Sequence, residues 1–211
     1  MSNVKIDGAK NGPLLVKGMK TILMADGTEK EVEGTIALCR CGGSANKPFC
    51  DGTHSKNGFS SERETDRSND RWRDYEGKEI MVHDNRTICS HAEECLKNSP
   101  SVFKAKEKPW IVPDAASRDE IIATVKKCPS GALSYTVDGK LYDKFSNWTG
   151  IEVTADGPYH VEGAVEIEDP TGMTPPNQDH YALCRCGASK NKPFCDGEHA
   201  NAGFKDPGVW E

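Results

Sequence analysis

Hydrophobic residues occur in short clusters along this chain, and those in its middle predict a small unit of strands and helices. Strands are expected at Glu79–Val82 and Leu133–Val137. A helix is expected at His91–Lys97 and an extended segment at Trp110–Val112. A second helix spans Ser117–Lys127, because Ser117 and Glu120 form a capping box and Pro129 follows its end. The charged stretch Ser60–Asp74, rich in Ser and Arg, is typical of a solvated linker.

Two segments that flank this unit repeat each other. Gly12-Pro13 and Gly58-Phe59 recur as Gly157-Pro158 and Gly203-Phe204, at a constant offset of 145 residues and with no gap. A repeat of this length indicates two copies of one small domain. We therefore expect three domains, at residues 1–60, 61–145 and 146–211.

Each repeat contains three cysteines and one histidine at the spacing C-x-C-x8-C-x3-H, and together they use six of the nine cysteines. The candidate ligands are Cys39, Cys41, Cys50 and His54 in the first repeat and Cys184, Cys186, Cys195 and His199 in the second. Thiolates are soft ligands that select zinc, copper(I) or iron–sulfur clusters. Zinc is the simplest alternative, although zinc sites usually open with a wider pair of cysteines. The Gly42-Gly43-Ser44 loop offers backbone donors that can approach inorganic sulfides, because glycine has no Cβ.

The repeated string resembles the signature of the CDGSH iron–sulfur family (mitoNEET-like, zinc-finger type), C-x-C-x2-[S/T]-x3-P-x-C-D-G-[S/A/T]-H. The first repeat matches every position, through Ser44, Pro48 and Thr53, and the second departs only at Glu198. The resemblance covers about residues 12–60 and 157–205, and it implies one [2Fe–2S] cluster in each ligand set. Single CDGSH domains are similar in forming homodimers. Here one chain supplies both halves, which predicts an intramolecular pseudo-two-fold pair.

The mixed ligand set has electrostatic consequences. A neutral imidazole in place of a fourth thiolate makes the cluster less negative, which raises its reduction potential. The imidazole must be neutral to bind, so mild acid competes with the metal. Asp51 is expected to cap a short helix that carries His54 and ends at Gly58. Glu198 beside His199 favours a protonated imidazole, so we expect the second cluster to be more acid-labile and lower in potential.

The middle unit holds the three remaining cysteines, Cys89, Cys95 and Cys128. Residues 65–138 resemble a divergent [4Fe–4S] single-cluster ferredoxin domain, with the frame C-x2-C-x2-C…C-P. The three cysteines take its first, third and fourth positions, and Ala92 stands at the second. Three thiolates suffice for a [3Fe–4S] cluster, whereas a [4Fe–4S] cluster could add His91 or water. Alternatively, the domain is a relic with reduced, buried cysteines. We favour a surface role for His91 over ligation.

Composition narrows the class of protein. The chain has 211 residues, a net charge of −6 and 36% hydrophobic residues, so three small modules bury little core each. The clusters should then act as structural cores, and the apo-protein should be largely disordered. The expected fold class is α+β: two β-rich CDGSH domains and a ferredoxin-like α/β insert. The acidic balance argues against nucleic acid. The N-terminus lacks an apolar leader and no span approaches membrane length, which favours a cytoplasmic location.

These features favour a non-enzymatic electron-transfer protein that serves a redox partner, as a monomer or a homodimer. Nothing resembles a catalytic triad, a P-loop or a dinucleotide-binding glycine motif. A second hypothesis is a protein that stores [2Fe–2S] clusters and donates them to apo-acceptors. A third is a zinc-bound structural adaptor. The remaining histidines, His83, His160 and His180, have no partner at ligand spacing.

Overall fold

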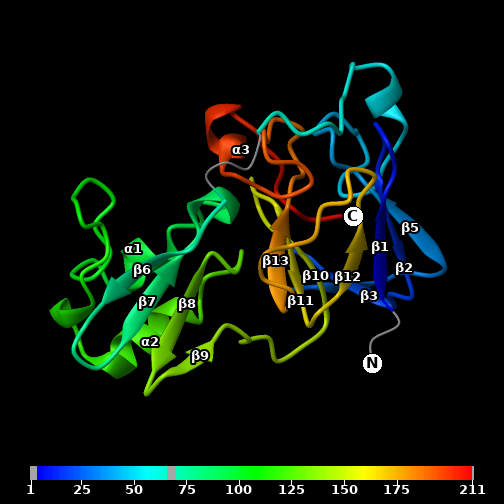
Figure 1. The fold of residues 1–211 in the computed structure, drawn as a ribbon. Coiled ribbons are helices and arrows are strands. Elements are labelled where there is room, and N and C mark those ends of the chain that lie inside the picture. Colours follow the sequence, from blue (N-terminus) through cyan, green and yellow to red (C-terminus); the bar gives the residue numbers. More distant parts are fainter. Residues whose placement is uncertain (1–3, 66–69, 211) are drawn as a thin grey trace.

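The computed structural model describes residues 4–65 and 70–210. Each repeat forms a small β-unit followed by a ligand loop and a short helical turn (Figure 1). The first repeat contributes β1 (Lys5–Gly8), β2 (Leu14–Lys17), β3 (Thr21–Leu23), β4 (Glu29–Glu31), β5 (Thr35–Leu38) and the 3₁₀ turn η1 (Thr53–Ser55). The second contributes β10 (Gly150–Val153), β11 (Tyr159–Glu162), β12 (Glu166–Glu168), β13 (His180–Leu183) and α3 (Glu198–Asn201).

The two repeats exchange strands. The antiparallel strands β1, β2 and β5 gain β12 of the second repeat, which runs parallel to β1 with Ile6 opposite Ile167. Reciprocally, β13, β11 and β10 gain β3 and β4 of the first repeat, with Leu23 opposite Glu152. The repeat offset relates β3 to β12, so each repeat donates the equivalent strand to the other. The repeats therefore pair within one chain, as predicted.

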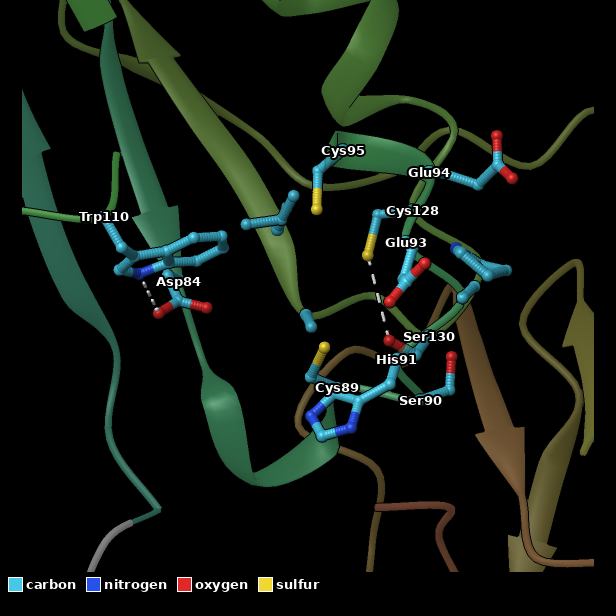
Figure 2. Close-up of a pocket in the computed structure, with 14 residues that line it drawn as sticks. Asp84, Cys89, Ser90, His91, Glu93, Glu94, Cys95, Trp110, Cys128 and Ser130 are labelled. Atoms are coloured by element: carbon cyan, nitrogen blue, oxygen red, sulfur yellow. Dashed lines mark hydrogen bonds between the residues drawn. The ribbon is translucent and has the colours of Figure 1, made fainter. Parts of the chain in front are cut away.

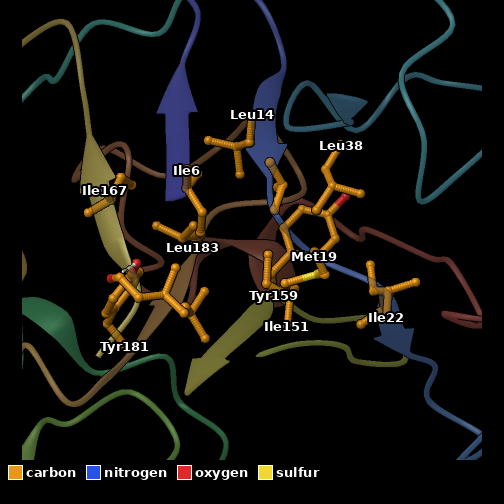
Figure 3. Packing of buried hydrophobic residues seen from close by; sticks show 14 of the residues in the cluster. Ile6, Leu14, Met19, Ile22, Leu38, Ile151, Tyr159, Ile167, Tyr181 and Leu183 are labelled. Carbon is orange, nitrogen blue, oxygen red and sulfur yellow. Dashed lines mark hydrogen bonds between the residues drawn. The ribbon is translucent and has the colours of Figure 1, made fainter. Parts of the chain in front are cut away.

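One hydrophobic core lies between the exchanged strands. Alternation along β2 buries Leu14 and Val16, and the equivalent positions Tyr159 and Val161 are buried in β11. Figure 3 shows side chains from both repeats packed against one another in this cluster. Burial of apolar groups stabilises by about 0.8 kcal/mol per CH₂. Since neither repeat alone can enclose these residues, pairing of the repeats is part of folding.

The central module forms a separate four-stranded antiparallel sheet in the order β6–β7–β8–β9. Its own core, which includes Val82, Phe103 and Ile121, lies between this sheet and helix α2. The elements of the module are β6 (Arg73–Glu76), β7 (Met81–Asp84), η2 (Arg86–Ile88), α1 (Glu94–Asn98), η3 (Pro113–Ala115), α2 (Arg118–Val125), β8 (Leu133–Val137) and β9 (Lys140–Tyr142).

The structure confirms some predicted elements of this module and corrects others. Strand β8 has the predicted bounds, and the Ser117 hydroxyl caps α2 by accepting the N–H of Glu120 at 3.3 Å. The strand predicted at Glu79–Val82 starts two residues later. The helix predicted from residue 91 shrinks to α1, because His91 and Glu93 have left-handed backbone angles, with φ of 56° and 62°. Such angles do not belong in a right-handed helix.

The stretch predicted as a solvated linker, residues 60–74, lies partly outside the described residues, which omit 66–69. Its described part makes backbone contacts with the second repeat. The backbone N–H groups of Glu64 and Thr65 donate to the carbonyl of Lys190 at 2.9 and 3.3 Å, and β6 already begins at Arg73. The side chains of Glu62, Glu64 and Thr65 are exposed as a solvated linker requires, but backbone hydrogen bonds tie the segment to the second repeat.

At the level of fold class, small β-sheets dominate and helices are few and short. The α+β expectation therefore holds only in part. Within the described residues, no helix combines the length and the apolar character that crossing a bilayer requires.

Candidate metal centres

The four predicted ligands of the first repeat come together as two pairs. Cys39 follows the end of β5, and its Sγ lies 3.7 Å from that of Cys41. The Sγ of Cys50 lies 3.3 Å from Nδ1 of His54, which η1 carries. The ligands of the first repeat thus lie on two loops, as a thiol pair and a thiol–imidazole pair.

The second repeat reproduces this arrangement. The Sγ atoms of Cys184 and Cys186 are 3.8 Å apart, and the Sγ of Cys195 lies 3.4 Å from Nδ1 of His199. Among the described residues, no three His, Cys, Asp or Glu side chains converge on one ion position. Donors gathered two by two suit a centre with two metal atoms, since each atom then receives one pair.

Backbone N–H groups point at the thiols. Gly43 donates to the Sγ of Cys41 and Gly52 to that of Cys50, both at 3.4 Å. The second repeat has the same two bonds, from Ala188 to Cys186 and from Gly197 to Cys195, also at 3.4 Å. Such donors stabilise thiolate charge, and hydrogen bonds to sulfur tune iron–sulfur centres. The donor set of each repeat thus fits an iron–sulfur group.

An aspartate holds the ligand loop of each repeat. The carboxylate of Asp51 accepts the N–H of Ala45 at 2.8 Å and that of Thr53 at 3.0 Å. These bonds hold the pKa of Asp51 well below its usual range. Asp196 accepts the equivalent N–H groups of Lys190 and Glu198. The predicted helix is only the three-residue turn η1, whose N-cap is Gly52, so Asp51 anchors the loop before the ligand histidine and does not cap the turn.

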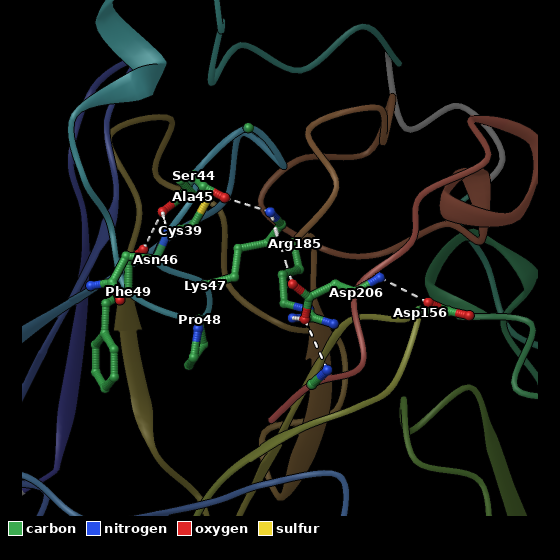
Figure 4. A network of polar contacts seen from close by, with 12 residues as sticks. Cys39, Ser44, Ala45, Asn46, Lys47, Pro48, Phe49, Asp156, Arg185 and Asp206 are labelled. Atoms are coloured by element: carbon green, nitrogen blue, oxygen red, sulfur yellow. Dashed lines mark hydrogen bonds and ion pairs between the residues drawn. The ribbon is translucent and has the colours of Figure 1, made fainter. Parts of the chain in front are cut away.

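Buried cations support the two sites from behind (Figure 4). The Nε of Arg185 donates to the carbonyl of Gly157 at 2.9 Å, and its Nη1 pairs with Asp206 at 2.5 Å. Lys47 of the first repeat approaches the same carboxylate, with Nζ 3.9 Å from Oδ2. Arg40 repeats the first contact, donating from Nε to Gly12 at 2.7 Å. Asp206 therefore links both repeats behind their ligand loops.

The two sites meet backbone to backbone. Cys41 and Cys186 form an isolated antiparallel bridge. A Cβ on Gly42 would lie 2.5 Å from the carbonyl oxygen of Cys186, and one on Gly187 would lie 2.8 Å from that of Cys41. Only glycine permits this approach, and both residues also have positive φ. The loop glycines thus serve the contact between repeats.

The central cysteines also come together. Cys89, Cys95 and Cys128 line one pocket between β8, α1 and the loop before α1 (Figure 2). Burial and then the charge of Cys128 raise the pKa of Cys89 to about 11 and that of Cys95 to about 12. These thiols therefore stay protonated at neutral pH unless a metal displaces their protons. All nine cysteines are free of disulfides.

The pocket contains groups that sequence reasoning missed. Asp84 is buried at its wall, where burial raises its pKa to about 6 and the indole of Trp110 donates to it at 3.1 Å. Glu93 also lines the pocket, and Figure 2 shows its carboxylate turned toward Cys128. The sequence signal for Asp84 was its position at the end of a buried strand, and for Glu93 its place in the cysteine segment.

Ala92, at the second position of the ferredoxin frame, lines the pocket without a ligating atom. His91 lies at the edge of the pocket beside Cys89 (Figure 2), and it also packs on Gly197 of the second repeat. His91 therefore contacts the second repeat from the central module, which is a more specific role than the surface position predicted for it.

Groups other than Glu198 determine the direction in which the pKa of His199 is shifted. Glu198 accepts a hydrogen bond from Asn201 at 3.0 Å. Burial, and after it the neighbouring His91, lower the pKa of His199 rather than raise it. The pKa of His199 is thus lowered despite the neighbouring Glu198, whereas the acid lability and the potential of the second cluster stay predictions.

The other three histidines each lie beside a carboxylate. Nδ1 of His83 lies 2.7 Å from Asp74, that of His160 lies 3.2 Å from Glu152, and that of His180 lies 3.1 Å from Asp179. These contacts account for all three without a metal.

Comparison with known proteins agrees with this geometry. The family described as "Iron-binding zinc finger CDGSH type" matches residues 11–55 and 156–200, and the family "Divergent 4Fe-4S mono-cluster" matches residues 75–138. Two curated relatives, both "Uncharacterized protein YjdI", from Escherichia coli K12 and Escherichia coli O157:H7, are 39% identical over 64 residues. That stretch is 30% of this chain and 84% of each relative. No solved structure matches the chain.

Proposed function

Because the chain belongs to the iron-binding CDGSH family, with a divergent 4Fe-4S mono-cluster domain between its two CDGSH domains, we propose that it is a multi-centre electron carrier. Each CDGSH domain holds one [2Fe–2S] cluster through three cysteines and one histidine. The central domain holds a third cluster, of the [3Fe–4S] or [4Fe–4S] type. The protein passes single electrons to a redox partner protein and converts no substrate itself.

The observation that carries this proposal is the pairing of donors in each repeat. Cys39 with Cys41, and Cys50 with His54, offer two donors to each of two iron atoms. A single zinc ion needs four donors around one point. The pairs, the N–H···S bonds and the family match together favour the two-iron centre.

The ligand types favour moderate-potential electron transfer. One neutral imidazole per site removes one negative charge from the cluster, and histidine ligands raise the potential of Rieske centres for this reason. Arg40, which lies between Cys39 and Cys41 in the sequence, is buried, and its positive charge favours the reduced state of a negative cluster at the first site. The charge of Arg185 is paired with Asp206.

The central site supplies three thiols and, at the same pocket, the carboxylate of Glu93. Three thiols complete a [3Fe–4S] cluster. A [4Fe–4S] cluster requires a further ligand for its fourth iron, which Glu93 or water provides in this proposal. Three cysteines that line one pocket favour a bound cluster over an empty relic, although a metal must displace the protons of thiols whose pKa is raised by burial.

Storage and donation of clusters is the second candidate, and one observation favours it. Cys39, Cys184 and Cys195 are buried, whereas the remaining ligands are partly exposed: Cys41, Cys50, Cys186, His54 and His199. Each site is therefore partly accessible to an apo-acceptor that could take a cluster.

A reductive titration of the purified protein, with an apo-ferredoxin present or absent, separates the two candidates. Electron transfer predicts reversible bleaching and recovery of the visible absorption, with the full iron and sulfide content retained. Transfer of intact clusters to the apo-ferredoxin, faster from the reduced or mildly acidified protein, would support donation instead. Irreversible loss of absorption on reduction without acceptor would contradict the electron-carrier proposal.

A further inference from the structure

The central module docks on the second repeat through the loop that carries its first cysteine. The side-chain amide of Asn191, within the second ligand loop, donates to the carbonyl of Thr87 at 2.5 Å. Four residues further along the chain, His91 packs on Gly197, which lies between the ligands Cys195 and His199. The ligand segments of the two sites are therefore in direct contact.

The contact at Gly197 is tight and has no equivalent in the first repeat. A Cβ on Gly197 would lie 2.3 Å from Nδ1 of His91 and 2.6 Å from its Cγ. Gly52, its counterpart 145 residues earlier, has the same φ of 87°, and a Cβ there would meet nothing within 4 Å. The two repeats are thus alike in ligands but different in neighbours.

The second site also contacts the first repeat. The first CDGSH site is linked to the second on another side, by the backbone bridge between Cys41 and Cys186. The buried hydroxyl of Tyr159, from the second repeat, also donates to the carbonyl of Cys39 at 2.7 Å. The second site therefore has a neighbour on either side.

We propose that the second CDGSH site is the obligatory intermediate between the central site and the first, with the Cys89–His91 segment packed on Gly197 as the electronic contact. This inference rests on the proposed electron-carrier function. If the three central cysteines hold one reducible group and the ligands of the second repeat hold another, a single electron would cross this contact and then the bridge between Cys41 and Cys186. Such a transfer would break no bond and move no proton, and an external one-electron donor would supply the electron.

Matched ligand variants of the full chain test the order of the sites. Cys195→Ser empties the second site, and Cys50→Ser, at the equivalent position, empties the first. After rapid one-electron reduction with a chemical donor, the order predicts normal transfer from the central site to the second in Cys50→Ser. In Cys195→Ser, transfer from the central site to the first should be lost. Undiminished transfer to the first site in Cys195→Ser would overturn the order.

The glycine pair tests the contact with every ligand kept. Gly197→Ala forces His91 away, whereas Gly52→Ala carries the same backbone strain at a site that faces open space. Electron paramagnetic resonance of the fully reduced protein should show magnetic interaction between the central and second centres. Gly197→Ala should lose this interaction at unchanged iron and sulfide content, and Gly52→Ala should keep it. Interaction that persists in Gly197→Ala, or is absent from the unaltered protein, would overturn the role of the contact.

The electron-carrier function and this inference fail in different ways. Without reducible clusters in the unaltered protein, the proposed function itself fails. If the clusters reduce reversibly but exchange electrons in another order, the electron-carrier function stands. Only the proposed role of the second site as intermediate then fails.

Discussion

The imidazoles of His54 and His199 are the residues through which acid acts on this protein. Each faces a cysteine at 3.3–3.4 Å through Nδ1. The carboxylate of Asp51, by contrast, keeps its N–H bonds in mild acid, because they hold its pKa well below the usual range. Mild acid therefore leaves in place the aspartate bonds that hold the first ligand loop.

Replacing the ligand histidines should make the centres more resistant to acid. The pKa of His199 is lowered, so its neutral form is fully favoured above the free value near 6.5. That stabilisation is lost as pH falls through the lowered pKa. We expect His54→Cys and His199→Cys each to retain the visible absorption of its site at a pH where the unaltered protein bleaches, and to lower its reduction potential. An unchanged pH profile would contradict histidine ligation.

Glu198 should matter less to acid stability than its position suggests. Burial and His91 determine the direction of the pKa shift of His199, and Glu198 is engaged with Asn201. We expect Glu198→Thr to move the midpoint of acid bleaching at the second site by less than about half a pH unit. A shift of a full unit toward lower pH would restore the charge argument made from sequence.

The ligands could be identified from sequence because their chemistry is local. Cysteines and a histidine within sixteen residues specify a site whatever surrounds it. The environment of His199 could not be identified, because His91 reaches it from a position more than one hundred residues away. The residue types determine which side chains can bind a metal, and tertiary packing determines how far the pKa of each is shifted.

At the scale of elements, the exchanged strands and the loop glycines determine how the repeats meet. Strand β8 and the capped helix α2 could be predicted, since their apolar spacing and cap lie within a few residues. The exchange of β3 and β12 could not, because nothing in a three-residue strand states which sheet it joins. His91 and Glu93 similarly shorten α1 through backbone angles that tertiary contacts impose.

The contact between Gly42 and Cys186 provides a direct test of this arrangement. Gly42→Ala places a Cβ against a backbone carbonyl, so the two ligand loops must separate. Gly27→Ala is a suitable control, because Gly27 also has positive φ but faces open space. We expect Gly42→Ala to lower the free energy of unfolding of the loaded protein by roughly 1–3 kcal/mol more than the control does.

Chemical denaturation followed by visible absorption and circular dichroism would measure this difference. Equal destabilisation by Gly42→Ala and Gly27→Ala would mean that the close approach of the two loops contributes nothing to stability.

At the scale of the whole molecule, the two repeats are one folding unit and the central module is a second. Their cores are distinct, one shared by both repeats and one enclosed by β6–β9 and α2. Composition alone suggested three small modules that depend on metal. The shared core argues against that expectation for the repeats, because pairing gives them one common apolar interior.

Metal removal should therefore act locally. After chelation under reducing conditions, we expect amides in residues 39–54 and 184–199 to exchange rapidly with solvent, while β2 and β11 remain protected by the common core. Hydrogen exchange followed by mass spectrometry resolves these segments. Uniformly rapid exchange throughout the apo-protein would show that the clusters, rather than the shared core, hold the fold together.

The most direct test of the central claim is the iron and acid-labile sulfide content of the full chain, purified without oxygen. Two [2Fe–2S] clusters with a third cluster predict seven irons and eight sulfides per chain for the [3Fe–4S] type. The [4Fe–4S] type raises the iron to eight, because iron and sulfide are equal in that cluster. Four of each would mean that the pocket of Cys89, Cys95 and Cys128 holds no cluster. Zinc without sulfide would contradict the account as a whole.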